Sequence, residues 1–244
     1  MKYFGYFLGN QRFIYFISLI TLFVGYAYYG SFKYLSEEAE RISSGSNYLP
    51  RGDFGILLLI QVASLVFLLF VLSERGENLS NLGVSFQKKD FIDSLKIFFY
   101  GFGLIVLTAV IYAAVRHWFS KESFSLENQN LTKPYERAIS NLPISILAPL
   151  VIINPLSEEL IVRAFLMTEL NYYLKKGPPV VFLSALTQTG YHLYQGWKNC
   201  GYHLITFLVF SAYYQKTKRA TPLVLVHFYM DLIAISLLFF KHKT

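Results

Sequence analysis

The sequence has little charge and almost no cysteine. Charged residues make up 15% of its 244 positions, against roughly 25% in an ordinary soluble domain. The lone Cys200 permits neither an intramolecular disulfide nor a cysteine metal cluster. Apolar residues make up 54%, which is more than the roughly 45–50% of a soluble chain. These proportions exclude soluble enzymes, disordered linkers and disulfide scaffolds.

Two sequence signatures of soluble hydrolases are also missing. The chain contains no H-E-x-x-H, so it lacks the helix that places two histidine ligands and a glutamate base around zinc. It contains no G-x-S-x-G either, which argues against a serine nucleophile on a strand-to-helix elbow.

Long apolar segments dominate the rest of the chain. Several approach the length of about 20 residues that an α-helix needs to cross a bilayer. The sequence therefore predicts an all-α, polytopic transmembrane bundle of about seven helices. Because the fifth and sixth segments are short and 195–202 could extend either, six to eight crossings fit. The expected segments are 13–30, 55–73, 91–115, 144–174, 179–194, 203–214 and 222–240.

The basic residues lie in short clusters between these segments. Although the net charge is +7, this distribution is typical of membrane-surface anchors rather than of nucleic-acid binding. Seven crossings place ten Lys and Arg residues on each side, so their total does not set the orientation. The tightest clusters, Lys175–Lys176 and 216–219, fall on the amino-terminal side and favour a cytoplasmic amino terminus.

Charged residues enter the fourth apolar segment. Asn154-Pro155 interrupts the apolar run, and Glu158, Glu159 and Arg163 follow. Glu159 and Arg163 are spaced i, i+4 with the acid first, which favours a salt bridge on one helix face. Glu158 would point about 100° away on a regular helix. We therefore expect Glu158 to be unpaired and available as a general base.

Two further segments carry histidine. His192 ends the fifth segment, with Gln188 one turn earlier on the same face, and His227 and Asp231 share a face of the seventh. If these faces meet the acidic pair, they form a polar site inside the bilayer that can hold and activate a water. His203 has no acidic neighbour at helical spacing, so we interpret it as structural.

Each group also has a structural interpretation. Glu159 with Arg163 can be a buried ion pair, His192 an interhelical hydrogen-bond partner, and His227 with Asp231 an intrahelical pair or a proton relay. The combination favours function, because two adjacent carboxylates and two histidine-bearing helices are costly to insert into a membrane.

The ordered motifs resemble those of the CPBP family of intramembrane proteases. These motifs are E-E-x-x-x-R from Glu158 to Arg163, His192 in a His-Leu-Tyr-Gln-Gly context, and H-x-x-x-D from His227 to Asp231. The family includes the CAAX prenyl endopeptidases and bacterial abortive-infection and bacteriocin-immunity proteins. The resemblance covers 154–232, within a single membrane domain divided into amino-terminal helices over 1–136 and a CPBP-like catalytic core over 137–240.

The resemblance implies an endopeptidase of a bacterial plasma membrane that uses water to cleave a membrane-associated peptide or protein, prenylated or bacteriocin-related. Glu158 would be the general base and His192 would help to hold the water. Glu159 and Arg163 would orient the helix, and His227 with Asp231 would polarise the scissile carbonyl or its oxyanion.

The residues alone fix no cofactor. The family has been described both as metal-dependent and as metal-free, and glutamate and histidine can both ligate zinc. A divalent metal such as zinc therefore remains compatible with the sequence, with Glu158, His192 and His227 as candidate ligands.

Two positions depart from the family's pattern. Gln188 stands where the second motif usually has Phe, and Asp231 stands where the third motif often has Asn. An ionised Asp cannot donate a hydrogen bond to an oxyanion. Two other functions therefore stay open: a catalytically silent scaffold or immunity protein on the same fold, and a proton-coupled transporter that uses the buried acids as a relay.

Overall fold

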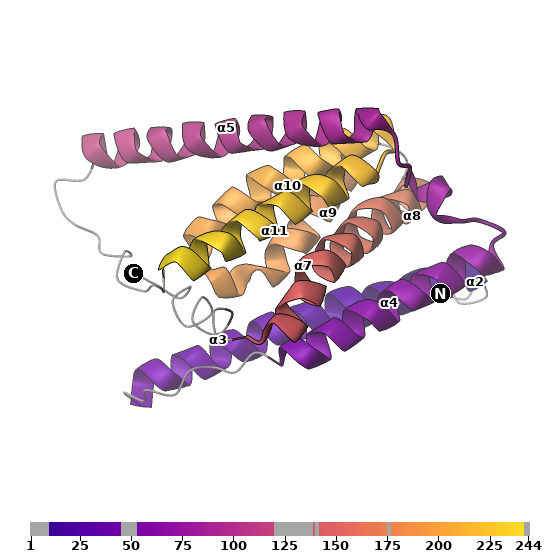
Figure 1. The fold of residues 1–244 in the computed structure, drawn as a ribbon, viewed down its shortest axis with the longest axis horizontal. Coiled ribbons are helices and arrows are strands. Elements are labelled where there is room, and N and C mark those ends of the chain that lie inside the picture. Colours follow the sequence, from indigo (N-terminus) through magenta and orange to yellow (C-terminus); the bar gives the residue numbers. More distant parts are fainter. Residues whose placement is uncertain (1–9, 45–52, 120–138, 140–141, 175–176, 242–244) are drawn as a thin grey trace.

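The computed structural model describes residues 10–44, 53–119, 139, 142–174 and 177–241. All regular structure in these residues is helical, which confirms the predicted all-α bundle. Seven rods follow one another along the described chain (Figure 1); five of them are single α-helices, and the other two each contain a π-helical segment. The first rod comprises α2 (Gln11–Ile20), the π-helix η1 (Thr21–Gly25) and α3 (Tyr26–Ser44).

The other rods correspond to the remaining predicted segments. The fourth combines α7, the π-helix η4 and α8, and short 3₁₀ turns lie in the linkers before α5 and α10. Their bounds are α4 Phe54–Glu74, η2 Leu79–Leu82, α5 Lys88–Phe119, α7 Ile144–Ser157, η4 Glu158–Phe165, α8 Leu166–Leu174, α9 Pro178–Tyr191, η5 Leu193–Gln195, α10 Trp197–Thr217 and α11 Thr221–Lys241.

Five of these rods are long and apolar enough to cross a membrane. They are Gln11–Glu40, Phe54–Glu74, Lys88–Ile111, Ile144–Leu174 and Thr221–Leu238. The chain is accordingly an integral membrane protein. The predicted fifth crossing, α9, has 14 residues. At 1.5 Å per residue it is about 21 Å long, short of a hydrocarbon layer roughly 30 Å thick.

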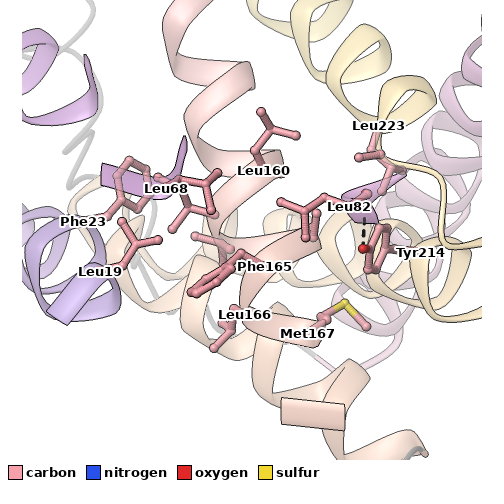
Figure 2. Packing of buried hydrophobic residues seen from close by; sticks show 14 of the residues in the cluster. Leu19, Phe23, Leu68, Leu82, Leu160, Phe165, Leu166, Met167, Tyr214 and Leu223 are labelled. Atoms are coloured by element: carbon pink, nitrogen blue, oxygen red, sulfur yellow. Dashed lines mark hydrogen bonds between the residues drawn. The ribbon is translucent and has the colours of Figure 1, made fainter. Parts of the chain in front are cut away.

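The rod α7–η4–α8 lies at the centre of the bundle. Every side chain from Glu158 to Phe165 is buried. Phe165, Leu166 and Met167 belong to one apolar cluster with Leu19 of α2 and Leu68 of α4 (Figure 2). Large apolar side chains on the outer faces of α4 and α5, such as Leu59 and Phe99, are exposed. Such faces fit contact with lipid, where burial against protein is not needed.

The Asn154-Pro155 pair does not end the fourth rod. Pro149 and Pro155 both lie inside α7, although proline removes a helical hydrogen bond. Ser157 Oγ donates to the carbonyl oxygens of Ile153 (2.8 Å) and Asn154 (3.0 Å), and the chain then widens into η4. The interruption expected from sequence is therefore a change of helix type, of the kind often found at functional sites.

Candidate active site

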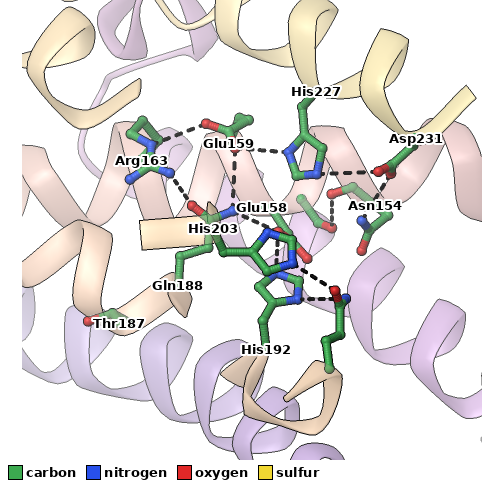
Figure 3. A network of polar contacts seen from close by, with 12 residues as sticks. Asn154, Glu158, Glu159, Arg163, Thr187, Gln188, His192, His203, His227 and Asp231 are labelled. Atoms are coloured by element: carbon green, nitrogen blue, oxygen red, sulfur yellow. Dashed lines mark hydrogen bonds and ion pairs between the residues drawn. The ribbon is translucent and has the colours of Figure 1, made fainter. Parts of the chain in front are cut away.

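The candidate site lies where η4 meets α9, α10 and α11. Glu158, Glu159 and Arg163 come from η4, His192 follows α9, and His227 and Asp231 come from α11. Figure 3 shows these side chains in one connected polar network. The convergence expected from the sequence is therefore present, and the six predicted site residues meet.

Arg163 occupies the interior of this network. Its side chain is fully buried, and its Nε donates to Glu159 Oε2 at 3.2 Å, as the i, i+4 spacing predicts. Its Nη1 donates to Ser184 Oγ of α9 at 2.8 Å and to Ser211 Oγ of α10 at 2.5 Å. Its Nη2 donates to Gln188 Oε1. One guanidinium thus ties three rods together and compensates a buried carboxylate.

Glu159 also contacts the seventh rod. Its Oε1 lies 3.0 Å from His227 Nδ1. On the other side of the imidazole, His227 Nε2 is 3.7 Å from Asp231 Oδ1. His227 is buried, whereas the Asp231 side chain is 28% exposed. The imidazole therefore connects the buried ion pair to the more accessible edge of the site.

Glu158 is not unpaired, as the sequence analysis expected, and it does not face away from Glu159. Gln188 Nε2 donates to Glu158 Oε2 at 2.7 Å and lies 3.4 Å from Glu159 Oε1. The prediction assumed a regular α-helix, but the π-helical turn of η4 brings the two carboxylates to one amide. Gln188, which departs from the family's pattern, thus bridges both carboxylates and Arg163.

His192 faces Glu158 across a short gap. Its Nε2 is 3.7 Å from Glu158 Oε2, which is too long for a direct hydrogen bond. That nitrogen is buried and has no hydrogen-bond partner among the described residues. A gap of this length between two polar atoms is one that a water molecule can bridge.

His203 packs against the ring of His192. The rings of His192 and His203 stack with centroids 4.7 Å apart, and Phe207 stacks on both. Gln195 Oε1 lies 2.7 Å from His203 Nε2, and Gln195 Nε2 lies 3.5 Å from His192 Nδ1. Sequence reasoning left His203 outside the site because its contacts are aromatic and amide contacts rather than acidic ones.

Two further polar residues were missed. Asn154 of α7 lies between Asp231 and Gln61 of α4, with its Nδ2 3.3 Å from Asp231 Oδ2 and its Oδ1 2.7 Å from Gln61 Nε2. Asn154 precedes Glu158 by four residues, a spacing that could have indicated a shared face. Gln61, a polar residue within an otherwise apolar segment, was a second available signal.

The arrangement offers no evident metal cage. Among the described ranges, no group of three or more His, Cys, Asp and Glu side chains is spaced to hold a metal ion. His227 Nδ1 is already engaged by Glu159. The candidate set of Glu158, His192 and His227 therefore does not fit a zinc site in this arrangement.

Comparison with known proteins agrees with the motifs. No curated protein and no solved structure matches the chain. Residues 140–233 match a family model described as type II CAAX prenyl endopeptidase Rce1-like. This interval contains all three motifs, and the description names a CAAX protease rather than an immunity protein. The match confirms the resemblance seen in the sequence: residues 140–233 are similar to the Rce1-like type II CAAX prenyl endopeptidases.

Proposed function

We propose that this protein is an intramembrane endopeptidase that hydrolyses a peptide bond of a membrane-associated, prenylated substrate with a water activated by Glu158. The observation that carries the proposal is the position of Glu158. Its Oε2 faces His192 Nε2 at 3.7 Å, whereas the neighbouring carboxylate, Glu159, is already paired with Arg163.

The two carboxylates have different surroundings, which suggests different roles. Glu159 lies against Arg163 and His227, so its charge is compensated and its oxygens are occupied. Glu158 receives one hydrogen bond from the neutral amide of Gln188 and faces an imidazole nitrogen. A carboxylate without a fixed cation is the better proton acceptor, because accepting the proton breaks no salt bridge.

The reaction then proceeds in two steps. Glu158 takes a proton from a water held between its carboxylate and His192, and the water oxygen bonds to the scissile carbonyl carbon. The carbonyl electron pair moves to oxygen, which becomes an oxyanion. When this intermediate collapses, the C–N bond breaks and the amine takes the proton from Glu158. The products are a carboxylic acid and an amine, and Glu158 returns to its starting state.

The remaining predicted residues support this centre. Arg163 and Glu159 fix the direction of η4, and Glu159 holds the His227 ring through Nδ1. The ring's Nε2 is directed to the edge occupied by Asp231, where a substrate carbonyl can reach it. The description of the matched family model, type II CAAX prenyl endopeptidase, supports the proposal of a prenylated substrate.

Glu158→Gln tests the proposal directly. Purified protein in detergent or liposomes would be given a farnesylated peptide ending in Cys-aliphatic-aliphatic-X, and cleavage would be followed by mass spectrometry. Because Gln cannot accept the proton, we expect the rate to fall by roughly 10²–10⁴-fold. Glu74→Gln, at an exposed position at the end of α4, is the matched control and should cleave at the wild-type rate.

The outcomes separate the alternatives. Cleavage by Glu158→Gln at the wild-type rate would remove Glu158 as the base. A wild-type protein that cleaves neither prenylated nor unprenylated peptides would instead favour a silent scaffold on the same fold.

A further inference from the structure

Asn154 sits at the accessible edge of the candidate site. It lies one turn before Glu158 on the same rod and is partly exposed, whereas Glu159 and Arg163 are fully buried. Figure 3 shows its carboxamide beside Asp231. Asp231 also lies 3.7 Å from His227 Nε2, so Asn154 and this nitrogen border the same accessible carboxylate.

The neighbours of Asn154 fix the direction of its amide. Asp231 Oδ2 lies 3.3 Å away, and a carboxylate oxygen only accepts hydrogen bonds, so the NH₂ group must face it. The carbonyl oxygen then faces α4, where Gln61 Nε2 donates to it at 2.7 Å. The reverse orientation would set two acceptors against each other. Both contacts thus agree on one orientation, with the donor directed to the edge of the site.

The site needs a donor at this point. Hydrolysis places negative charge on the carbonyl oxygen, and donors aimed at that oxygen supply much of the rate enhancement in acyl transfer. Asp231, as a carboxylate, would repel the developing charge. The amide of Asn154 has two N–H groups, of which Asp231 accepts one. None of the described residues accepts the second.

The buried position of Gln61 is energetically unfavourable, and packing alone does not explain it. It is 2% exposed, and its Oε1 is buried with no partner among the described residues. Leaving a buried acceptor unsatisfied is unfavourable by roughly 1–3 kcal/mol. An amide retained in an apolar helix under this penalty fits a positioning role towards Asn154. Gln61 also lies outside the interval that matches the family model.

We infer that Asn154 is a catalytic residue that donates a hydrogen bond to the oxyanion, and that Gln61 of α4 is the positioning residue that orients its amide. The inference rests on the proposed function, because it assigns a donor for that hydrolysis. It also gives the amino-terminal half of the chain a part in the site.

Asn154→Leu tests this inference, because it keeps the side-chain volume and removes the amide. We expect kcat for the farnesylated peptide to fall by roughly 10²–10³-fold, as on removal of a single oxyanion donor, while KM changes little. Gln61→Met leaves Asn154 in place but releases its orientation, and a loss in kcat of about tenfold is expected. This second variant keeps the test decisive if Asn154→Leu does not fold.

The chain offers a matched control on the same rod. Asn171 of α8 exchanges two hydrogen bonds with Gln215 of α10, both at 2.9 Å, and so forms a similar interhelical amide pair. It lies 17 residues beyond Asn154, about 25 Å along the helix axis. Asn171→Leu should lower the melting temperature as Asn154→Leu does, and leave kcat unchanged.

The results are read against the Glu158→Gln variant. Suppose that the wild type cleaves the peptide and that Glu158→Gln does not. If Asn154→Leu then has the same kcat as Asn171→Leu, the oxyanion role of Asn154 is overturned, while the protease function stands. A fall in kcat confined to Asn154→Leu and Gln61→Met would support the inference. Absence of cleavage by wild type would overturn the proposed function itself.

Discussion

Arg163 is the residue on which the charge balance of the site depends. Its fully buried guanidinium donates to Glu159, Ser184, Ser211 and Gln188, which belong to three different rods. Charged groups inside a bilayer protein persist only when paired and hydrogen-bonded. Most of its donors are used for this purpose, so Arg163 contributes structure and charge compensation rather than a contact with substrate.

We therefore expect replacement of Arg163 to destabilise the fold rather than to remove a group that contacts the substrate. Arg163→Met leaves Glu159 buried without its guanidinium, and breaking a buried pair in this way costs about 3–5 kcal/mol. For a chain of this size each kcal/mol lowers the melting temperature by roughly 2–4 °C. Thermal unfolding in detergent measures the effect.

Lys96→Met is the control for this prediction, because Lys96 is exposed on α5. It should melt close to the wild type. Equal melting temperatures for the two variants would contradict this prediction, because Arg163→Met leaves the buried Glu159 carboxylate without its partner.

Sequence reasoning found the residues whose partners lie on their own helix. Glu159 with Arg163, and His227 with Asp231, are i, i+4 pairs, and such spacing is visible in any helical segment. Ser184, Ser211 and Gln61 act across helices, and their partners depend on how the rods rotate against each other. That rotation is decided by packing of the whole bundle, so no local pattern could have supplied it.

At the scale of elements, the linker before α5 is joined to the turn between α10 and α11. Gly83 accepts a hydrogen bond from Ala220 N at 2.9 Å, and Thr221 Oγ1 accepts one from Ser85 N at 2.8 Å. Arg219, in the same turn, pairs with Asp90 and Asp93 of α5. These contacts attach α5 to the rod that carries His227.

Gly83 is the point of closest approach in this junction. Its φ of 81° lies in the left-handed region, and a Cβ there would be 1.8 Å from the Lys218 carbonyl oxygen. Gly83→Ala must therefore move backbone as well as strain its own conformation. We expect it to lower the free energy of unfolding by at least roughly 3 kcal/mol, in the range of severe single substitutions, as measured by thermal or denaturant unfolding.

Gly76→Ala separates the two causes. Gly76 also has a positive φ, 64°, but a Cβ there would meet nothing within 4 Å. Only the left-handed strain remains, which costs roughly 1–2 kcal/mol. If Gly83→Ala is no worse than Gly76→Ala, the junction does not hold α5 as closely as the structure places it.

Helix type was the element-scale feature that the sequence did not reveal. The apolar pattern located all seven rods, because each must cover or span a nonpolar layer. It did not show that 158–165 is π-helical, and this changed the expected direction of Glu158. The energies that separate an α-turn from a π-turn are small and are set by neighbouring contacts, here those of Arg163 with Ser184 and Gln188 of α9 and with Ser211 of α10.

Across the whole molecule, basic side chains gather at one end of the bundle. Arg12 at the start of α2 and Arg75 after α4 both bind the buried Glu169 of α8. The turn containing Arg219 is joined to the start of α5, which carries Lys88 and Lys89, and Figure 1 shows these element ends on one side. Basic residues at one membrane face are typical of the cytoplasmic side, so the amino-terminal end of α2 should face the cytoplasm.

Single-cysteine labelling tests this orientation. The lone Cys200 is 5% exposed and can be replaced by Ala to give a background without thiols. Lys89→Cys, at the start of α5, and Lys216→Cys, at the end of α10, place thiols at exposed positions of the basic end, and Ser43→Cys places one at the end of α3. In right-side-out vesicles, a membrane-impermeant maleimide should label only Ser43→Cys, and in inside-out vesicles only the other two.

The reverse pattern would invert the orientation but leave the fold intact. Labelling of Lys89→Cys and Lys216→Cys from opposite faces would contradict the arrangement of the rods itself, because the Arg219 contacts require the start of α5 and the end of α10 to share one side of the membrane.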